Sequence, residues 1–245
     1  MWTRKFSILA ICSILIISGC SDENPFEPDS SSPADPPGTL SAFHFPTTEG
    51  CSWQYELVDG NYTFTRKVAG TRYISSYNTR GMESDADFPV SDLAWLDQLY
   101  QIYGAPVRTS YFTKDLDSYT EYAVELWVEY WDDTLYQKII PKRVLWSFPL
   151  EADKEWIVLK SYTVPEVMYT RKVISTGEVL TVPAGTFRDV FYVEEYTSIA
   201  GFSDDEQIPA KYWLAPDVGV IKYEYFDFLI GITTTCELIE FSKGN

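Results

Sequence analysis

Apolar and polar residues alternate through most of the chain after residue 43, and this pattern is typical of half-buried β-strands. The clearest alternation spans residues 121–131, where one face carries a set that we expect in the core: Tyr122, Val124, Leu126, Val128 and Tyr130. Short turn sequences such as Asp59-Gly60-Asn61 separate these segments. The pattern predicts an all-β, mainly antiparallel fold, either an open half-barrel or a two-part sheet.

One segment departs from the strand pattern. Residues 92–103 repeat apolar side chains at helical spacing, between Ser91 and Gly104. We therefore expect one α-helix, Asp92 to Tyr103, that covers the concave face of the sheet or plugs one end. As a plug the helix is core; as a lid it would belong to a ligand site.

Two stretches of the β region resemble each other. The spacing from Phe to Trp is eight residues in both copies, and the repeated segments are Phe45-Pro46, Trp53 and Thr65-Arg66-Lys67-Val68, then Phe148-Pro149, Trp156 and Thr170-Arg171-Lys172-Val173. The repeat predicts a β domain of residues 43–245 built from two related halves, 43–147 and 148–245. Chance repetition in an aromatic-rich chain is the alternative.

The N-terminus carries an export signal. A basic start, Met1 to Lys5, precedes an apolar run, Phe6 to Ile17, that is too short to span a bilayer as a helix. Ile17-Ser18-Gly19-Cys20 matches a bacterial lipobox, so residues 1–19 are a predicted lipoprotein signal peptide and Cys20 the lipidated, palmitate-bearing N-terminus. A plain secretory peptide with an incidental cysteine is the alternative.

The segment after Cys20 predicts a tether. Residues 20–42 are rich in Ser and Asp, contain five Pro and have almost nothing apolar to bury. Ser21 directly after Cys20 predicts an outer-membrane lipoprotein that faces the periplasm or the cell surface. The membrane is thus an expected partner, through the N-terminal lipid.

Composition removes several function classes. The net charge of −17 disfavours nucleic acid as a partner. His44 is the only histidine, so a Ser-His-Asp or Cys-His arrangement has at most one candidate base, at the edge of the tether, and a multi-histidine metal site is excluded. No phosphate-binding loop is present. We predict no catalytic residue, no metal site and no cofactor.

Cysteine usage agrees with export. Cys12 would leave with the signal peptide and Cys20 would be lipidated, so Cys51 and Cys236 are left in an oxidising compartment. We expect a disulfide between them that fastens the two ends of the domain. Two buried thiols are the alternative.

Several motifs resemble a family of uncharacterised secreted bacterial lipoproteins. They are Val182-Pro183-Ala184-Gly185-Thr186-Phe187, Tyr212-Trp213-x-Ala215-Pro216-x-Val218-Gly219 and the two Phe-Pro and Trp pairs. The resemblance implies an antiparallel β domain, similar to the open half-barrel of periplasmic lipoprotein carriers, and it implies no catalytic residues. Many relatives have Gly before the second Trp, whereas this chain has Asp153-Lys154-Glu155, so the turn there should differ.

The other face of residues 121–131 is the candidate ligand surface: Glu125, Trp127, Glu129 and Trp131. Trp rings offer flat apolar faces to sugar rings, and carboxylates accept hydroxyl hydrogen bonds or, in pairs, hydrolyse glycosides. The alternative is that a helix or loop covers these aromatics and that they only support the fold.

The sequence therefore predicts a non-enzymatic binding or envelope-structural lipoprotein with an apolar ligand, a glycan or an envelope protein as its partner. A carboxylate-dependent glycan hydrolase is one alternative. A structural spacer without a ligand is the other.

Overall fold

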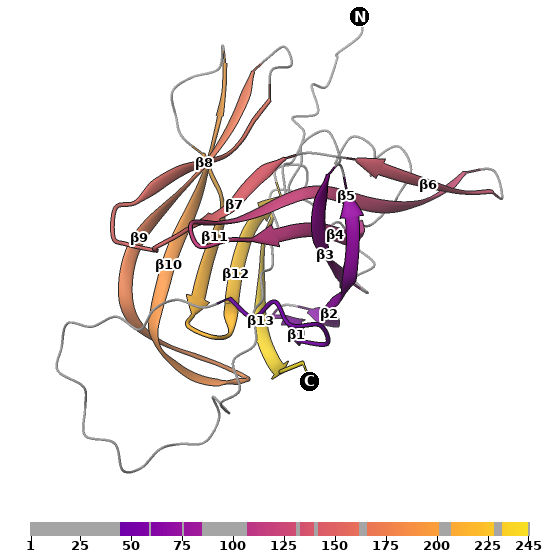
Figure 1. Cartoon of the computed structure of the whole chain (residues 1–245). Helices are drawn as coiled ribbons and strands as arrows, with labels where there is room; N and C mark the ends of the chain where they lie inside the picture. The colour runs from indigo at the N-terminus through magenta and orange to yellow at the C-terminus, as the bar shows by residue number, and fades with distance from the viewer. Residues whose placement is uncertain are drawn as a thin grey trace, which may run out of the picture.

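The computed structural model describes residues 45–58, 60–74, 76–84, 107–130, 133–139, 142–161, 166–200, 207–227 and 232–244. These residues form thirteen strands (Figure 1): β1 (Ser52–Leu57), β2 (Gly60–Ile74), β3 (Tyr77–Ser84), β4 (Val107–Lys114), β5 (Ser118–Tyr130), β6 (Asp133–Ile139), β7 (Arg143–Ser147), β8 (Glu155–Ser161), β9 (Val167–Val182), β10 (Gly185–Ile199), β11 (Gln207–Ala215), β12 (Gly219–Asp227) and β13 (Ile232–Ser242). The antiparallel all-β prediction is confirmed.

The predicted helix, Asp92 to Tyr103, lies outside the described residues, and those residues contain no helix at all. Accordingly, within the same ranges no helix is long and apolar enough to cross a membrane.

The strands form one antiparallel sheet in the order β6-β5-β4-β3-β2-β1-β13-β12-β11-β10-β9-β8, and β7 pairs with β5 beside this path. β5 is long enough to take two partners along one edge: Ser118–Glu121 pair with β7, and Val124–Tyr130 pair with β6. β7 in turn lies next to β8. The sheet is therefore a nearly closed barrel, more closed than the half-barrel that the sequence predicted.

The sheet order joins two six-stranded meanders head to tail. β1, the first strand of one meander, pairs with β13, the last strand of the other. Trp53 pairs with Arg66 in the β1–β2 register, and Trp156 pairs with Arg171 in the β8–β9 register. The repeated sequence segments thus occupy equivalent places in the two meanders.

Two of the sequence motifs form turns that hydrogen bond to other strands. At the β9–β10 turn, Ala184 donates its N–H to the carbonyl oxygen of Leu238 at 2.9 Å. At the β11–β12 turn, the carbonyl oxygen of Val218 accepts the indole N–H of Trp53 at 2.8 Å. The second of these bonds joins the two halves of the barrel, whereas the first lies within residues 148–245.

The barrel interior is filled by side chains. The largest of them expose less than 2 % of their surface: Trp53, Tyr55, Phe64, Phe112, Tyr119, Trp146, Arg171, Phe191, Tyr212 and Tyr223. Side chains with so little exposed surface are typical of a close-packed protein interior. A smaller cluster of Ile74, Tyr111, Tyr122 and Ala123 lies apart from this core.

Candidate functional site

Arg171, the fifth residue of β9, is fully buried and makes several polar contacts inside the barrel. Its Nε donates to Glu195 Oε2 at 2.8 Å, and its Nη2 lies 2.7 Å from the same oxygen. Nη1 donates to the carbonyl oxygen of Leu145 at 2.8 Å, and Nη2 donates to the hydroxyl oxygen of Tyr212 at 3.0 Å. The guanidinium also lies 4.5 Å from the ring of Trp146 and 4.4 Å from that of Tyr212.

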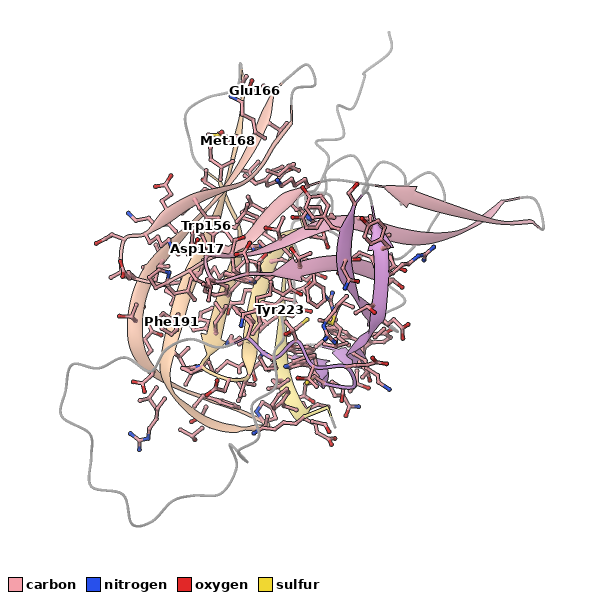
Figure 2. The ribbon with its side chains drawn as sticks, viewed as in Figure 1. Asp117, Trp156, Glu166, Met168, Phe191 and Tyr223 are labelled. Atoms are coloured by element: carbon pink, nitrogen blue, oxygen red, sulfur yellow. The ribbon has the colours of Figure 1, made fainter. Side chains whose placement is uncertain are left out.

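These bonds cross the place where the sheet closes. Leu145 belongs to β7, and the next contact along β7 is the carbonyl oxygen of Val144, which accepts the indole N–H of Trp156 at 3.2 Å. Figure 2 labels Trp156, which belongs to β8. Side chains from β8 and β9 thus hydrogen bond to the backbone of β7, and we call this contact the β7–β8 seam.

A second buried ion pair lies on the other side of β7. Arg143 donates to Glu121 Oε2, and the two side chains are 3 % and 1 % exposed. Glu121 Oε1 and Glu195 Oε1 have no hydrogen-bond partner in the described structure. Neither carboxylate can reach solvent, so neither can act on a substrate that stays outside the barrel.

Burial shifts the titration of several interior groups. It raises the pKa of Tyr55, of Tyr119 and of Tyr223, and the Arg66 guanidinium opposes the shift in all three. The Tyr55 hydroxyl donates to the carbonyl oxygen of Val220 at 2.8 Å, whereas the Tyr119 hydroxyl has no partner among the described groups. These phenols stay neutral at physiological pH and serve as packing groups.

The outer face carries a row of aromatic and charged residues across four strands. Tyr192 of β10 pairs with Trp213 of β11, Trp213 with Lys222 of β12, and Lys222 with Glu237 of β13. The rings of Tyr192 and Trp213 stack with centroids 4.9 Å apart and an interplanar angle of 17°. On the other side of Trp213, Lys222 Nζ lies 5.2 Å from the ring centroid. We call these four residues the outer row.

Tyrosine hydroxyls fix a carboxylate beside the outer row. Tyr192 and Tyr196 donate to the two oxygens of Glu194 at 2.5 and 2.6 Å. Burial and the hydrogen bond to Glu194 raise the pKa of Tyr192. Lys222 pairs with Glu237 at 3.1 Å and with Glu224 at 3.5 Å. Each of these charged groups is therefore already bonded within the sheet.

The backbone pairing of β5 shows where the residues of the predicted ligand surface lie. In the β5–β6 pairing, Glu125 lies opposite Lys138, Trp127 opposite Tyr136 and Glu129 opposite Thr134. Trp131 lies outside the described residues, as does the lipidation site Cys20. β4 pairs with β5 only as far as Leu126, so beyond that residue the described part of the hairpin has two strands. Figure 1 shows this β5–β6 hairpin extending away from strands β8–β13.

The predicted disulfide between Cys51 and Cys236 is not formed, and Cys236 is a free, buried thiol. Cys51 precedes Ser52, which pairs with Ser242, whereas Cys236 pairs with Leu57 at the far end of β1. This offset places the two cysteines roughly 20 Å apart along the strand, and a disulfide needs Cα atoms within about 7 Å. The sequence placed Cys51 at the first strand and Cys236 in the last, but it could not show the register that separates them.

Sequence reasoning missed the buried ion pairs and the outer row. Arg66, Arg171 and Glu195 stand at core-facing positions of alternating strands, and a charge at such a position was the available signal. The outer row had no signal, because its members come from four strands whose register the sequence does not give. Within the described part of the chain, no group of three or more His, Cys, Asp or Glu side chains could hold a metal ion.

No protein-family model and no curated protein sequence matches the chain. Two solved structures are similar to it. One is a predicted lipoprotein from Parabacteroides distasonis, with a TM-score of 0.36 and 17 % identity over 82 % of this chain and 99 % of that one. The other is a predicted exported protein with a YmcC-like fold from Bacteroides fragilis, with a TM-score of 0.33 and 14 % identity over 82 % of this chain and all of that one.

Proposed function

We propose that this chain is a non-enzymatic lipoprotein of the bacterial outer membrane, and that its barrel contacts an envelope protein through its outer surface. In this proposal Cys20 carries the lipid, and residues 20–42 hold the barrel away from the membrane. The observation that supports the outer surface is the filled interior. Side chains such as Trp53, Tyr55 and Trp146 expose almost none of their surface.

The same observation disfavours a carrier of fatty acids or lipids. A carrier needs a cavity lined by apolar groups, usually of about 300 Å³ or more. In this barrel the equivalent space holds aromatic rings and two buried ion pairs, Arg171–Glu195 and Arg143–Glu121. Opening such a space would break charged hydrogen bonds in a medium of low dielectric constant, at a cost of several kcal/mol.

A glycan is disfavoured as the partner of the outer row. Sugar rings bind to the open face of an aromatic ring. Trp213 has Tyr192 on one side and Lys222 on the other, and the carboxylate of Glu194 already accepts from two tyrosines. Aromatic residues with satisfied polar neighbours are typical of protein interfaces, where rigid side chains lose little entropy on binding.

The hydrolase hypothesis is disfavoured by spacing. Glu125 and Glu129 are four positions apart in β5, which places their backbones about 13 Å apart along a strand. Glycosidases separate their two carboxyl groups by about 5 to 9.5 Å. Glu125→Gln and Glu129→Gln should therefore leave any activity on envelope glycans unchanged.

Native mass spectrometry tests the proposal. The mature chain from Ser21 onward is secreted to the periplasm behind a cleavable signal peptide without a lipobox, and it is purified without detergent. We expect the mass of the bare polypeptide, because large buried side chains occupy the core of the described barrel. A retained fatty acid or phospholipid would contradict the proposal and establish a carrier.

Pull-down from membranes with Trp213→Ala and Tyr192→Ala then tests the outer row as a protein contact. The matched control is Ile157→Ala, which changes an exposed apolar residue on β8, away from the outer row. We expect that one envelope protein is no longer recovered with Trp213→Ala or Tyr192→Ala but is still recovered with Ile157→Ala. Retention of every partner by all three variants would exclude the outer row.

A further inference from the structure

The barrel closes without β6. β5 gives the first part of one edge to β7 and the second part to β6, and it is β7 that lies beside β8. β6 is therefore an end of the strand path whose outer edge has no strand partner among the described residues. Figure 1 shows it on the hairpin that extends away from the barrel.

Among the described residues the outer part of this hairpin has two strands, since β4 pairs with β5 only up to Leu126. A two-stranded hairpin is marginally stable in water, and it gains stability when further strands are added. An edge with free N–H and C=O groups is also a template for another strand. A further strand would therefore stabilise the hairpin, and the outer edge of β6 offers the backbone groups that could bind it.

The register of the hairpin shows which backbone groups face outward. Tyr130 pairs with Asp133 at the closed end, so the alternation of antiparallel pairing directs the N–H and C=O of Asp133 toward β5. The backbone groups of Thr134, Tyr136 and Lys138 then lie on the outer edge. Tyr136 is the central residue of β6.

We propose that β6 pairs antiparallel with β6 of a second copy of this chain, with Tyr136 on the twofold axis. Tyr136 then pairs with itself, and Thr134 pairs with Lys138 of the other copy. About six backbone hydrogen bonds form, and the two hairpins become one four-stranded sheet.

The residues of β6 are compatible with this self-pairing. Its charged members, Asp133 and Lys138, meet Ile139 and Thr134 of the second copy, so no like charges lie opposite each other. Trp127 lies opposite Tyr136 within each hairpin, so one row across the four strands reads Trp127, Tyr136, Tyr136, Trp127. The projecting position of the hairpin separates the two acidic barrels, and anchoring in one membrane would raise their local concentration.

Cysteine cross-linking of the full-length, lipidated chain in a bacterial envelope tests the register. Tyr136→Cys should form a covalent dimer, because the Cα atoms of a hydrogen-bonded antiparallel pair are about 5.5 Å apart, within the range of a disulfide. Thr134→Cys alone should remain at the level of the parent chain, because two copies of residue 134 would be about 14 Å apart. Combining Thr134→Cys with Lys138→Cys should restore the dimer.

Tyr136→Pro in this double-cysteine background removes one outward N–H without touching the pairing to β5. We expect it to abolish the cross-linked dimer while the barrel keeps its protease resistance. Equal cross-linking of Thr134→Cys and Tyr136→Cys would show random collision and overturn the proposal. Absence of a dimer with Tyr136→Cys would overturn it as well, and so would a dimer that survives Tyr136→Pro.

Discussion

Trp156 lies directly opposite Arg171 in the β8–β9 register, and both side chains donate to carbonyl oxygens of β7. Trp53 lies opposite Arg66 in the same way, but its indole N–H bonds to Val218 in the β11–β12 turn. Each tryptophan therefore reaches from its own half of the barrel into the other half. Backbone pairing between β1 and β13 also joins the two halves, with one register shift between Gln54 and Tyr55, whereas the β7–β8 seam of the described residues depends on side chains.

The buried pair Arg171–Glu195 should dominate the stability of the seam. Arg171→Met removes the cation and leaves the Glu195 carboxylate charged and almost fully buried, which we expect to cost about 3–5 kcal/mol in the free energy of unfolding. Arg171→Met combined with Glu195→Met should be less destabilised than Arg171→Met alone, because no unpaired charge is left. Urea unfolding followed by tryptophan fluorescence measures both values.

The exposed pair Lys160–Glu166 is the matched control for that experiment. Its side chains are 37 % and 44 % exposed, so Lys160→Ala should change the free energy of unfolding by less than about 1 kcal/mol. A double variant that is no more stable than Arg171→Met would contradict the interpretation that an unpaired charge is the source of the loss.

The two tryptophans allow a second comparison. Trp53→Phe and Trp156→Phe each remove an indole N–H from a carbonyl oxygen, Val218 in one case and Val144 in the other. We expect Trp53→Phe to cost about 1–3 kcal/mol, because its carbonyl partner is left unsatisfied in a buried place. Trp156 makes the longer bond and is 9 % exposed, so Trp156→Phe should cost less.

Hydrogen exchange measures which strands lose stability when a tryptophan is replaced. Trp156→Phe should speed amide exchange in β7 and β8 and leave β1 and β13 unchanged, because only the seam lacks a backbone ladder at this point. Faster exchange in β1 instead would mean that the two tryptophans do not act locally.

Two buried tyrosines differ in their hydroxyl partners and provide a third test. Tyr55→Phe loses the hydrogen bond to the Val220 carbonyl and should destabilise the barrel by about 1 kcal/mol or more. Tyr119→Phe removes a hydroxyl without a partner among the described groups, so stability should be unchanged or higher. Thermal unfolding at pH 7 distinguishes the two outcomes, and an equal loss in both variants would refute the assignment.

The same tyrosines predict the behaviour at high pH. Burial raises the pKa of Tyr55, Tyr119 and Tyr223, so the folded state binds protons that the unfolded state releases. Their contribution to stability is complete below about pH 10 and is lost as the pH rises above that value. Phenolate absorbance of these residues should therefore appear together with unfolding, and Tyr119→Phe should make the loss less steep.

The strand pattern could be predicted because alternation is a local property of the sequence. Within each strand it indicates which residues face the core and which face solvent. The closure of the barrel could not, because it depends on the pairing of Ser52 with Ser242 and on the sharing of β5 between β6 and β7. The disulfide prediction failed for the same reason. Cys51 and Cys236 are on adjacent strands, but the register offsets them, and a sequence without a turn between two strands does not define their register.

The candidate site shows the same limit. Alternation predicts that Glu125, Trp127 and Glu129 share one face of a strand. It does not show that they lie opposite Lys138, Tyr136 and Thr134 on a hairpin that leaves the barrel. The outer row required four strands to be aligned before Tyr192, Trp213 and Lys222 could be recognised as neighbours. The sequence could have indicated that Arg171 forms a buried ion pair, because a charge in a core-facing position needs a partner. It gave no indication that the partner is Glu195.

Cys236 provides the last prediction. Burial raises the pKa of its thiol to about 12, and the Tyr223 hydroxyl and Arg66 oppose that shift only in part. At pH 8 the thiolate fraction is then on the order of 10⁻⁴, so native Cys236 should resist iodoacetamide and react fully once the chain unfolds. Ser242→Cys, at an exposed position of the same strand, is the control that should be alkylated at once. Mass spectrometry of peptides measures both sites, and rapid alkylation of native Cys236, or a Cys51–Cys236 disulfide in its place, would contradict the β1–β13 register.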